Sequence, residues 1–271
     1  MAATKLCRVL SAFLIDRYRW IRLRLPQPWS RRFGQLAYAP RLVTGHESTR
    51  REFTEEPVIL RLALGREPLQ AVGAGLTERV VEIPWVWRRL SGRGERVLDI
   101  GTAYAPMIYK WLLVRQPDHV EVADLNEAAI PGLRSHVADV RALPFADDSY
   151  DVAICLSTLE HVGMDNANYG LDEVSGGDVE ALRELGRVAP RVLVTVPAGR
   201  DENMGWQRQY APSTLRRVID QAGLRVEHLE VFAHDRVTGW APVSEDAVAD
   251  CTYGQGSVAA AAIVCAELAR Q

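Results

Sequence analysis

The sequence contains little cysteine. Its 271 residues include four cysteines, at positions 7, 155, 251 and 265, and no two of them form a close pair. This spacing indicates neither a zinc site nor a disulfide framework, and a reducing, cytoplasmic environment fits it best. Cys155 and Cys265 lie in apolar runs, where a thiol behaves as a small hydrophobic group.

Long apolar runs are also missing. No stretch reaches the roughly 18–20 residues that cross a bilayer, and the N-terminus lacks the uninterrupted apolar region of a secretory signal. The formal charge is −3, so a general nucleic-acid binder is not expected. Asp165, Asp172 and Glu173 lie close together in the sequence, but without histidine ligands at regular spacing we expect a solvated loop and no metal.

Positive charge is concentrated near the N-terminus. Residues 1–34 hold eight Lys and Arg against Asp16, a net +7 that leaves −10 for the rest of the chain. Apolar residues at helical spacing within 6–25 predict an amphipathic helix with a basic face, ended by Pro26 and Pro28. We expect this arm to pack on its own domain or to join the subunits of a homodimer. A peripheral membrane contact is the less favoured alternative, because arginines interrupt the apolar face.

Strand-like and helix-like runs alternate from Arg96 onward. Strands are expected at 96–100, 119–125, just before Asp139, 152–157, 191–197, 225–233 and 257–267, and helices at 77–90, 106–115, 177–188 and 212–222. This alternation predicts an α/β, Rossmann-like fold: a mostly parallel, seven-stranded sheet with helices on both faces, plus an N-terminal helical extension. We divide the chain into an arm with a cap or lid of short helices, 1–76, and the α/β domain, 77–271.

Acidic residues follow three successive strands of the predicted sheet. Asp99, Asp124 and Asp139 each stand at or just beyond a strand end, and Gly101 opens the loop after the first strand. In an open parallel sheet, ligands bind outside the carboxyl ends of the strands, where the strand order reverses. An acid after the second strand accepts hydrogen bonds from ribose hydroxyls. The three acids therefore predict a nucleoside-type ligand.

The loop after the first strand is poor in glycine. Gly101 is its one glycine, and Pro106 stands where a dinucleotide fingerprint has its third. A dinucleotide enzyme lays a pyrophosphate directly on this turn and needs the close approach that several glycines allow. The loop therefore favours a cofactor without phosphate over NAD.

Four segments carry a family resemblance: VLDIG, VEVADLN, ADVRALPFADDSYDVAICLSTLEHVG and ELGRVAPRVLVTVPAG. They resemble the successive motifs of class I S-adenosylmethionine-dependent methyltransferases, over roughly 77–268. The resemblance implies S-adenosylmethionine as cofactor and methylation of an oxygen or nitrogen of a small molecule. The spacing EHVG…NYG…GGD also resembles methyltransferases of bacterial surface-sugar and secondary-metabolite gene sets, which favours such an acceptor. The family commonly has glycines where this chain has Ala103 and Ala105.

The resemblance further implies that the cofactor is held by residues at four strand ends. These are Asp99, Gly101, Thr102 and Ala103 beside its methionine part, Asp124 at the ribose, Leu125 at the adenine face, Asp139 and the Val140 N–H at the adenine edge, and Ser157 beside the transferred methyl.

Methyl transfer from a sulfonium is an in-line displacement, so the protein mainly aligns the acceptor and excludes water. A hydroxyl acceptor must also lose its proton, and histidine is the usual base. We expect His161 in this role, with Glu160 as its partner; alternatively, His161 caps the strand-to-helix turn. Aromatic residues that could contact the acceptor, or simply pack, are Tyr104, Tyr169, Trp206 and Tyr210.

Two other functions stay open. The chain could be a catalytically inactive binding or scaffold protein that keeps the fold. A nucleic-acid methyltransferase that uses the basic arm is a weaker alternative, because the body is acidic and no acidic-aromatic tetrapeptide of the base-methylating kind follows the fourth strand near Ser157.

Overall fold

The structure is a computed structural model that describes residues 47–90, 92, 94–116, 119–128, 130–165, 173–255 and 259–271. The basic arm lies outside these residues, so its helix and its contacts with a second subunit or a membrane stay predictions. No helix in the described part is both long and apolar enough to cross a membrane.

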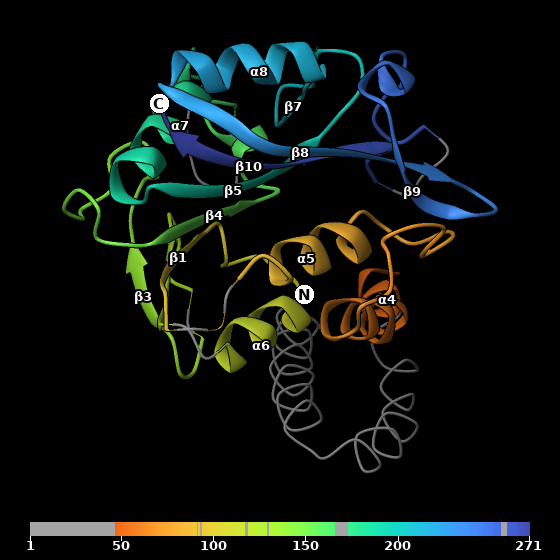
Figure 1. The fold of residues 1–271 in the computed structure, drawn as a ribbon, viewed down its shortest axis with the longest axis horizontal. Coiled ribbons are helices and arrows are strands. Elements are labelled where there is room, and N and C mark those ends of the chain that lie inside the picture. The colour runs from red at the N-terminus through yellow and green to blue at the C-terminus, as the bar shows by residue number, and fades with distance from the viewer. Residues whose placement is uncertain are drawn as a thin grey trace, which may run out of the picture.

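One mixed sheet of eight strands forms the centre of the described chain, in the order β3-β2-β1-β4-β5-β10-β8-β9 (Figure 1). Five strands are parallel: β1 (Arg96–Ile100), β2 (His119–Asp124), β3 (Arg134–Val137), β4 (Val152–Leu156) and β5 (Arg191–Pro197). β10 (Ala262–Arg270) runs antiparallel between β5 and β8 (Leu224–Asp235), and β9 (Gly239–Val243) adds an antiparallel edge.

The structure confirms the predicted Rossmann-like fold, with three differences in the strands. β9 is an eighth strand that the alternation did not predict, because Pro242 lies inside it; proline is tolerated there since the strand forms a sheet edge. The last strand begins at Ala262, five residues later than the apolar run from 257 suggests. A two-stranded hairpin of β6 (Glu202–Asn203) and β7 (Arg208–Gln209) was also not predicted.

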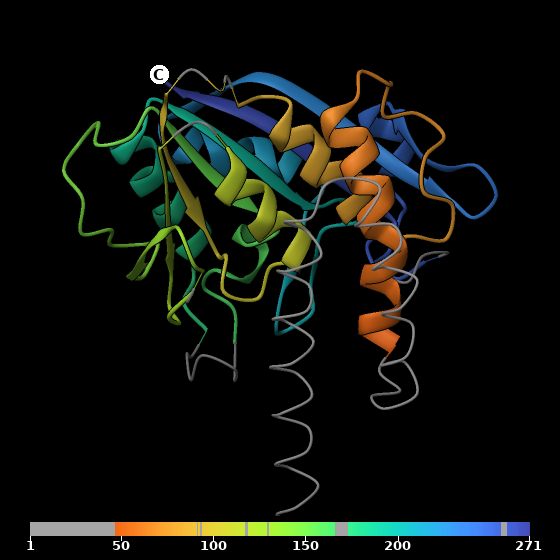
Figure 2. The ribbon, with the colours of Figure 1, turned by 90° about the horizontal axis from the view of Figure 1, so that it is seen from below.

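Helices cover both faces of the sheet. α7 (Gly177–Val188) and α8 (Pro212–Gln221) lie on one face, and α4 (Glu47–Leu64), α5 (Arg79–Trp87) and α6 (Met107–Arg115) lie on the other (Figures 1 and 2). The elements η1 (Leu159–His161) and η2 (Glu245–Val248) are short 3-10 helices. The predicted bounds of α7 match the structure, because its apolar residues recur with a clear helical period.

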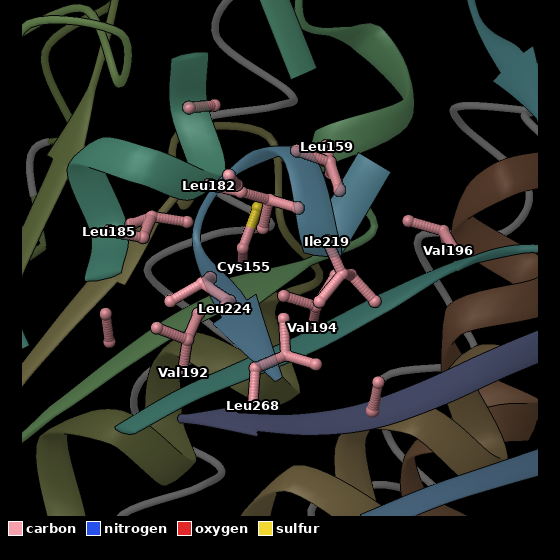
Figure 3. Close-up of a cluster of buried hydrophobic side chains, with 14 of the residues drawn as sticks. Cys155, Leu159, Leu182, Leu185, Val192, Val194, Val196, Ile219, Leu224 and Leu268 are labelled. Atoms are coloured by element: carbon pink, nitrogen blue, oxygen red, sulfur yellow. The ribbon is translucent and has the colours of Figure 1, made fainter. Parts of the chain in front are cut away.

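The two helical layers enclose two hydrophobic cores. Successive side chains of a strand point to opposite faces, so Val97 and Ile154 pack toward α5 and α6 while Leu98 and Cys155 pack toward α7 and α8. Figure 3 shows the second core, where leucines of α7 meet strand residues of the sheet. Strands buried on both faces read as continuous apolar runs, which is why they were recognisable in the sequence.

The described part of the region expected to form a cap of short helices, residues 47–76, contains one helix of 18 residues, α4, which runs through Pro57. Its Ile59 and Leu62 belong to the same core as Ile83 of α5. The chain then passes along the sheet edge, where Val72 forms a β-bridge with Trp240. Residues 47–76 thus pack against the α/β fold, and the division of the chain at residue 76 stays a prediction.

Candidate functional site

A cavity of about 420 Å³ opens at the carboxyl ends of β1, β2 and β4, where strand order reverses. Nine of the residues assigned from the sequence line it: Gly101, Tyr104, Asp124, Leu125, Asp139, Val140, Ser157, His161 and Trp206. The cavity therefore brings together six of the nine residues assigned to the cofactor with the histidine assigned to the acceptor, whereas Asp99, Thr102 and Ala103 do not line it.

Gly101 follows β1 directly and lies against Thr158, which comes two residues after β4. Its φ is +83°, and a Cβ there would lie 2.1 Å from Oγ1 and 2.9 Å from Cβ of Thr158. A side chain is excluded both by conformation and by space. This position therefore requires glycine.

The alanines of the same loop do not need to be glycine. The non-glycine residues with positive φ in the described chain are Ala71, Asp148 and Ser157, so neither Ala103 nor Ala105 is left-handed. Their methyl groups pack against the core beneath α6. One glycine is therefore enough to shape this turn, although Ala105 also lines the cavity.

Asp124 is fixed by backbone hydrogen bonds. The N–H of Ala103 donates to its Oδ2 and the N–H of Asn126 donates to its Oδ1, each at 2.9 Å. The residue is only 4% exposed, yet it lines the cavity. Each oxygen of a carboxylate can accept a further hydrogen bond, so Asp124 presents fixed acceptors to a ligand.

Asp139 forms an ion pair that the sequence did not suggest. Arg141 donates to both carboxylate oxygens through its side chain and to Oδ1 through its backbone N–H. The hydrogen bonds from Arg141 hold the pKa of Asp139 below its ordinary value, so the carboxylate stays charged. Arg141 itself lines the cavity and shares this end of it with Asp139.

Asp99 and Thr102 face away from the cavity, which corrects the expected direct contact. Asp99 is fully buried, with Thr102 Oγ1 donating to it at 2.5 Å and the Tyr109 hydroxyl donating from α6. Its side chain points to the same face as Val97, toward α6. Burial raises the pKa of Asp99 to about 7, although the hydrogen bonds from Thr102 and Tyr109 oppose this shift. The hydrogen bond from the Tyr109 hydroxyl to Asp99 therefore links α6 to β1.

Helix α5 contributes a polar group that the sequence analysis did not identify. Glu82 is fully buried and accepts hydrogen bonds from Ser157 Oγ at 2.7 Å and Thr195 Oγ1 at 2.9 Å, while it also pairs with Arg79. Arg79 lines the cavity. The sequence signal was present, since an acid stands inside the apolar run VVEIPW, but nothing in the sequence showed what it would contact.

His161 lies on η1 with a defined tautomer. Its Nδ1 is 3.0 Å from the backbone carbonyl oxygen of Trp206. A carbonyl can only accept, so Nδ1 carries the proton and Nε2 keeps the lone pair. Burial lowers the pKa of His161; the Trp206 carbonyl opposes this effect and the nearby charge of Arg79 adds to it. The ring is therefore neutral near pH 7.

Glu160 is not the hydrogen-bonding partner of His161, whose ring nitrogen contacts Trp206 instead. Glu160 is 2% exposed and absent from the cavity lining, and its Oε2 has no hydrogen-bond partner. Burial raises its pKa to about 8. η1 turns the two neighbouring side chains in different directions, which sequence adjacency could not show.

The remaining assigned residues divide into two cases. Tyr210 is buried and its hydroxyl donates to Asp178 of α7 at 3.0 Å, so it packs inside the protein and does not line the cavity. Tyr169 lies outside the described residues. No group of three metal-ligating side chains occurs within the described ranges.

The family comparison agrees with this geometry. Residues 98–176, which include part of β1, all of β2, β3 and β4, and most of the cavity lining, match a family described as "Methyltransferase domain". Over this segment the chain is similar to methyltransferase domains. No curated protein matches the chain by sequence.

Solved structures share the fold of the methyltransferase domain. The [4+2]-cyclase SpnF is 15% identical, with a TM-score of 0.50 over 81% of this chain and 94% of that one. A SAM-dependent methyltransferase from Methanosarcina mazei is 14% identical, with a TM-score of 0.45 over 69% of this chain and 97% of the other. One from Mesorhizobium loti is 14% identical, with a TM-score of 0.45 over 69% and 96%. At such identities the likeness extends to the fold alone.

Proposed function

We propose that this chain is an S-adenosylmethionine-dependent methyltransferase that transfers a methyl group to an oxygen or nitrogen of a small molecule. The observation that best supports this proposal is the position of Asp124. Its carboxylate is nearly buried, is held by two backbone N–H groups, and lines the same cavity as Gly101 and His161. The fold alone does not decide for methylation, because a similar structure is described as a [4+2]-cyclase.

The cavity lining suits a cationic nucleoside. Asp124 would accept from ribose hydroxyls, Leu125 and Val140 offer apolar surface for a base, and Asp139 stands at the same end. Gly101 leaves its backbone accessible there. When bound, S-adenosylmethionine supplies a methyl group already activated on a sulfonium. The Asp124 carboxylate, which is held by neutral backbone N–H groups, favours that positive charge.

His161 would handle the proton of the acceptor. Because its Nδ1–H is held by the Trp206 carbonyl, Nε2 is available to accept a proton from an acceptor hydroxyl or amine. The ring is neutral near pH 7, which is the form a general base needs. Arg79, Ser157 and Met164 line the adjoining wall and restrict where an acceptor can lie.

Calorimetric titration with S-adenosylmethionine tests the cofactor assignment. We expect measurable binding, and Asp124→Asn should weaken it about tenfold or more, because an amide replaces two charged acceptors. Asp246→Asn, an exposed change on η2, should leave binding unaltered. Absence of binding by the unaltered protein would remove the proposal.

Turnover by the unaltered protein and by His161→Ala tests both the activity and the role of His161 as a base. General base catalysis contributes on the order of 10²–10⁴-fold, so turnover should fall by that factor while cofactor affinity stays within about twofold. The comparison uses single-turnover rates and calorimetry on the same preparations. Cofactor binding without turnover by the unaltered protein would favour the scaffold alternative. Turnover that His161→Ala does not change would leave His161 only a structural role.

A further inference from the structure

The wall of the cavity next to His161 carries an exposed indole. Trp206 lies in the turn of the β6–β7 hairpin and is 50% exposed, and it lines the cavity together with Tyr104, which is 71% exposed. Large apolar side chains left open to solvent beside a cavity mark a place where a partner or ligand binds.

The indole is held in a defined orientation. Its ring stacks on His161, with centroids 5.4 Å apart and planes at 29°, and Tyr253 meets it edge-on at 6.1 Å. The hairpin tip is tied to the segment after η1, because the Asp165 N–H donates to the carbonyl of Gly205 at 3.1 Å. A rigid, half-exposed aromatic surface therefore adjoins the histidine.

The chemistry of His161 limits the acceptor that it can help. A neutral imidazole with a lowered pKa is a weak base. It can assist a phenolic hydroxyl, which titrates near the tyrosine value of about 10, much more readily than an aliphatic hydroxyl, which resembles water at about 15.7. A sugar hydroxyl is therefore a poorer acceptor for this site than a phenolic hydroxyl, although the sequence resemblance favoured a sugar.

We propose that the acceptor is a planar aromatic compound bearing a hydroxyl, and that its ring packs on the exposed part of Trp206 while its hydroxyl faces Nε2 of His161. This inference rests on the proposed function, and it makes Trp206 a specificity-determining residue. The oxygen–hydrogen bond breaks toward Nε2, and the new oxygen–methyl bond forms as the methyl–sulfur bond of the cofactor breaks and leaves a neutral thioether.

The test measures acceptor binding directly. Protein loaded with S-adenosylhomocysteine is mixed with phenol, catechol, 2-naphthol, cyclohexanol and glucose, and ligand contact is read by saturation-transfer NMR and titration. We expect phenol, catechol and 2-naphthol to bind. When S-adenosylmethionine replaces S-adenosylhomocysteine, we expect these three compounds to be methylated, and kcat/KM for cyclohexanol and glucose to be at least tenfold lower.

Substitutions of Trp206 provide the matched comparison. Trp206→Ala should raise the KM for the aromatic acceptors about tenfold, with cofactor affinity unchanged, and Trp206→Phe should restore most of the loss because a ring remains. Melting temperatures show whether each variant is folded. Both variants keep the backbone carbonyl that holds His161.

Two failures can be told apart. If S-adenosylmethionine does not bind at all, the proposed function itself is wrong. If it binds, but cyclohexanol or glucose is used as well as the phenols, or a folded Trp206→Ala protein has an unchanged KM, only the aromatic acceptor is wrong.

Discussion

Two residues on neighbouring strand ends have left-handed backbones beside the cavity. Gly101 follows β1 with φ +83°, and Ser157 follows β4 with φ +41°. Glycine adopts this conformation without strain, whereas serine does so at a cost. The hydroxyl of Ser157 is tied to Glu82, and its N–H donates to the Thr195 carbonyl at 3.0 Å, so the surrounding structure holds it there. The cavity floor is therefore shaped by backbone conformation as much as by side chains.

Gly101→Ala should destabilise the protein more than a glycine replacement elsewhere. Gly223 also has positive φ, at +76°, but nothing lies within 4 Å of an added Cβ. Gly223→Ala should cost about 1 kcal/mol from conformation alone, and Gly101→Ala about 2–4 kcal/mol, because Thr158 must also move. Urea unfolding of both variants measures the difference. Equal losses would show that the contact with Thr158 does not matter.

At the scale of elements, α5 links the cavity to the carboxyl ends of β4 and β5. It places Arg79 in the cavity and Glu82 beneath β4 and β5, where the carboxylate receives two hydroxyl hydrogen bonds. A buried carboxylate with these partners is tolerated only because each bond is made. The helix before β1 is therefore part of the site as well as a cover for the sheet.

Removing the Glu82 carboxylate should loosen this connection. Glu82→Ala leaves the Arg79 charge, the buried hydroxyl of Thr195 and the half-buried hydroxyl of Ser157 without their acceptor, which should cost about 3–5 kcal/mol of unfolding free energy. Glu82→Gln keeps an acceptor oxygen of the same size and should cost less than half as much. Denaturant melts at pH 7 compare the two variants. If glutamine is as damaging as alanine, the charge on Glu82 dominates and the hydrogen bonds are minor.

At the scale of the whole molecule, several buried acids hold protons near neutral pH. Burial raises the pKa of Asp99 and of Glu78 to about 7, and that of Glu160 to about 8, from ordinary values of 3.8 and 4.5. Between these ordinary and raised values, the folded chain binds protons that the unfolded chain has released. The folded state is therefore favoured on the acidic side and loses that advantage as the pH rises through the raised values.

Stability should accordingly fall from about pH 4.5 to about pH 8, by several kcal/mol, and then level off. Glu160→Gln replaces one of these acids with a neutral group of the same shape, so its profile should be flatter. Urea unfolding at closely spaced pH values, at constant ionic strength, provides the comparison. A wild-type stability that rises over this interval would contradict the proton uptake on folding.

Local features of the chain could be predicted reliably. The period of α7, the apolar runs of β1, β4 and β5, and the positions of Asp124 and Asp139 after their strands depend on neighbouring residues only. The cavity residues on those strand ends could accordingly be assigned from sequence patterns. β9 was missed, and the region of α4 was expected to hold only short helices. Both elements contain a proline, which argues against a strand or a helix interior unless an edge position or packing compensates.

The amino-acid sequence by itself determined the order of strands and helices, and with it the edge of the sheet where a ligand binds, because hydrophobic periodicity and strand-end acids are properties of short segments. Only the tertiary structure decided which polar side chains reach that edge. Asp99 turns toward α6, Glu82 meets Ser157 across 75 residues, and His161 meets Trp206 across 45. Such contacts depend on how distant elements pack, and no local pattern encodes their distance or direction.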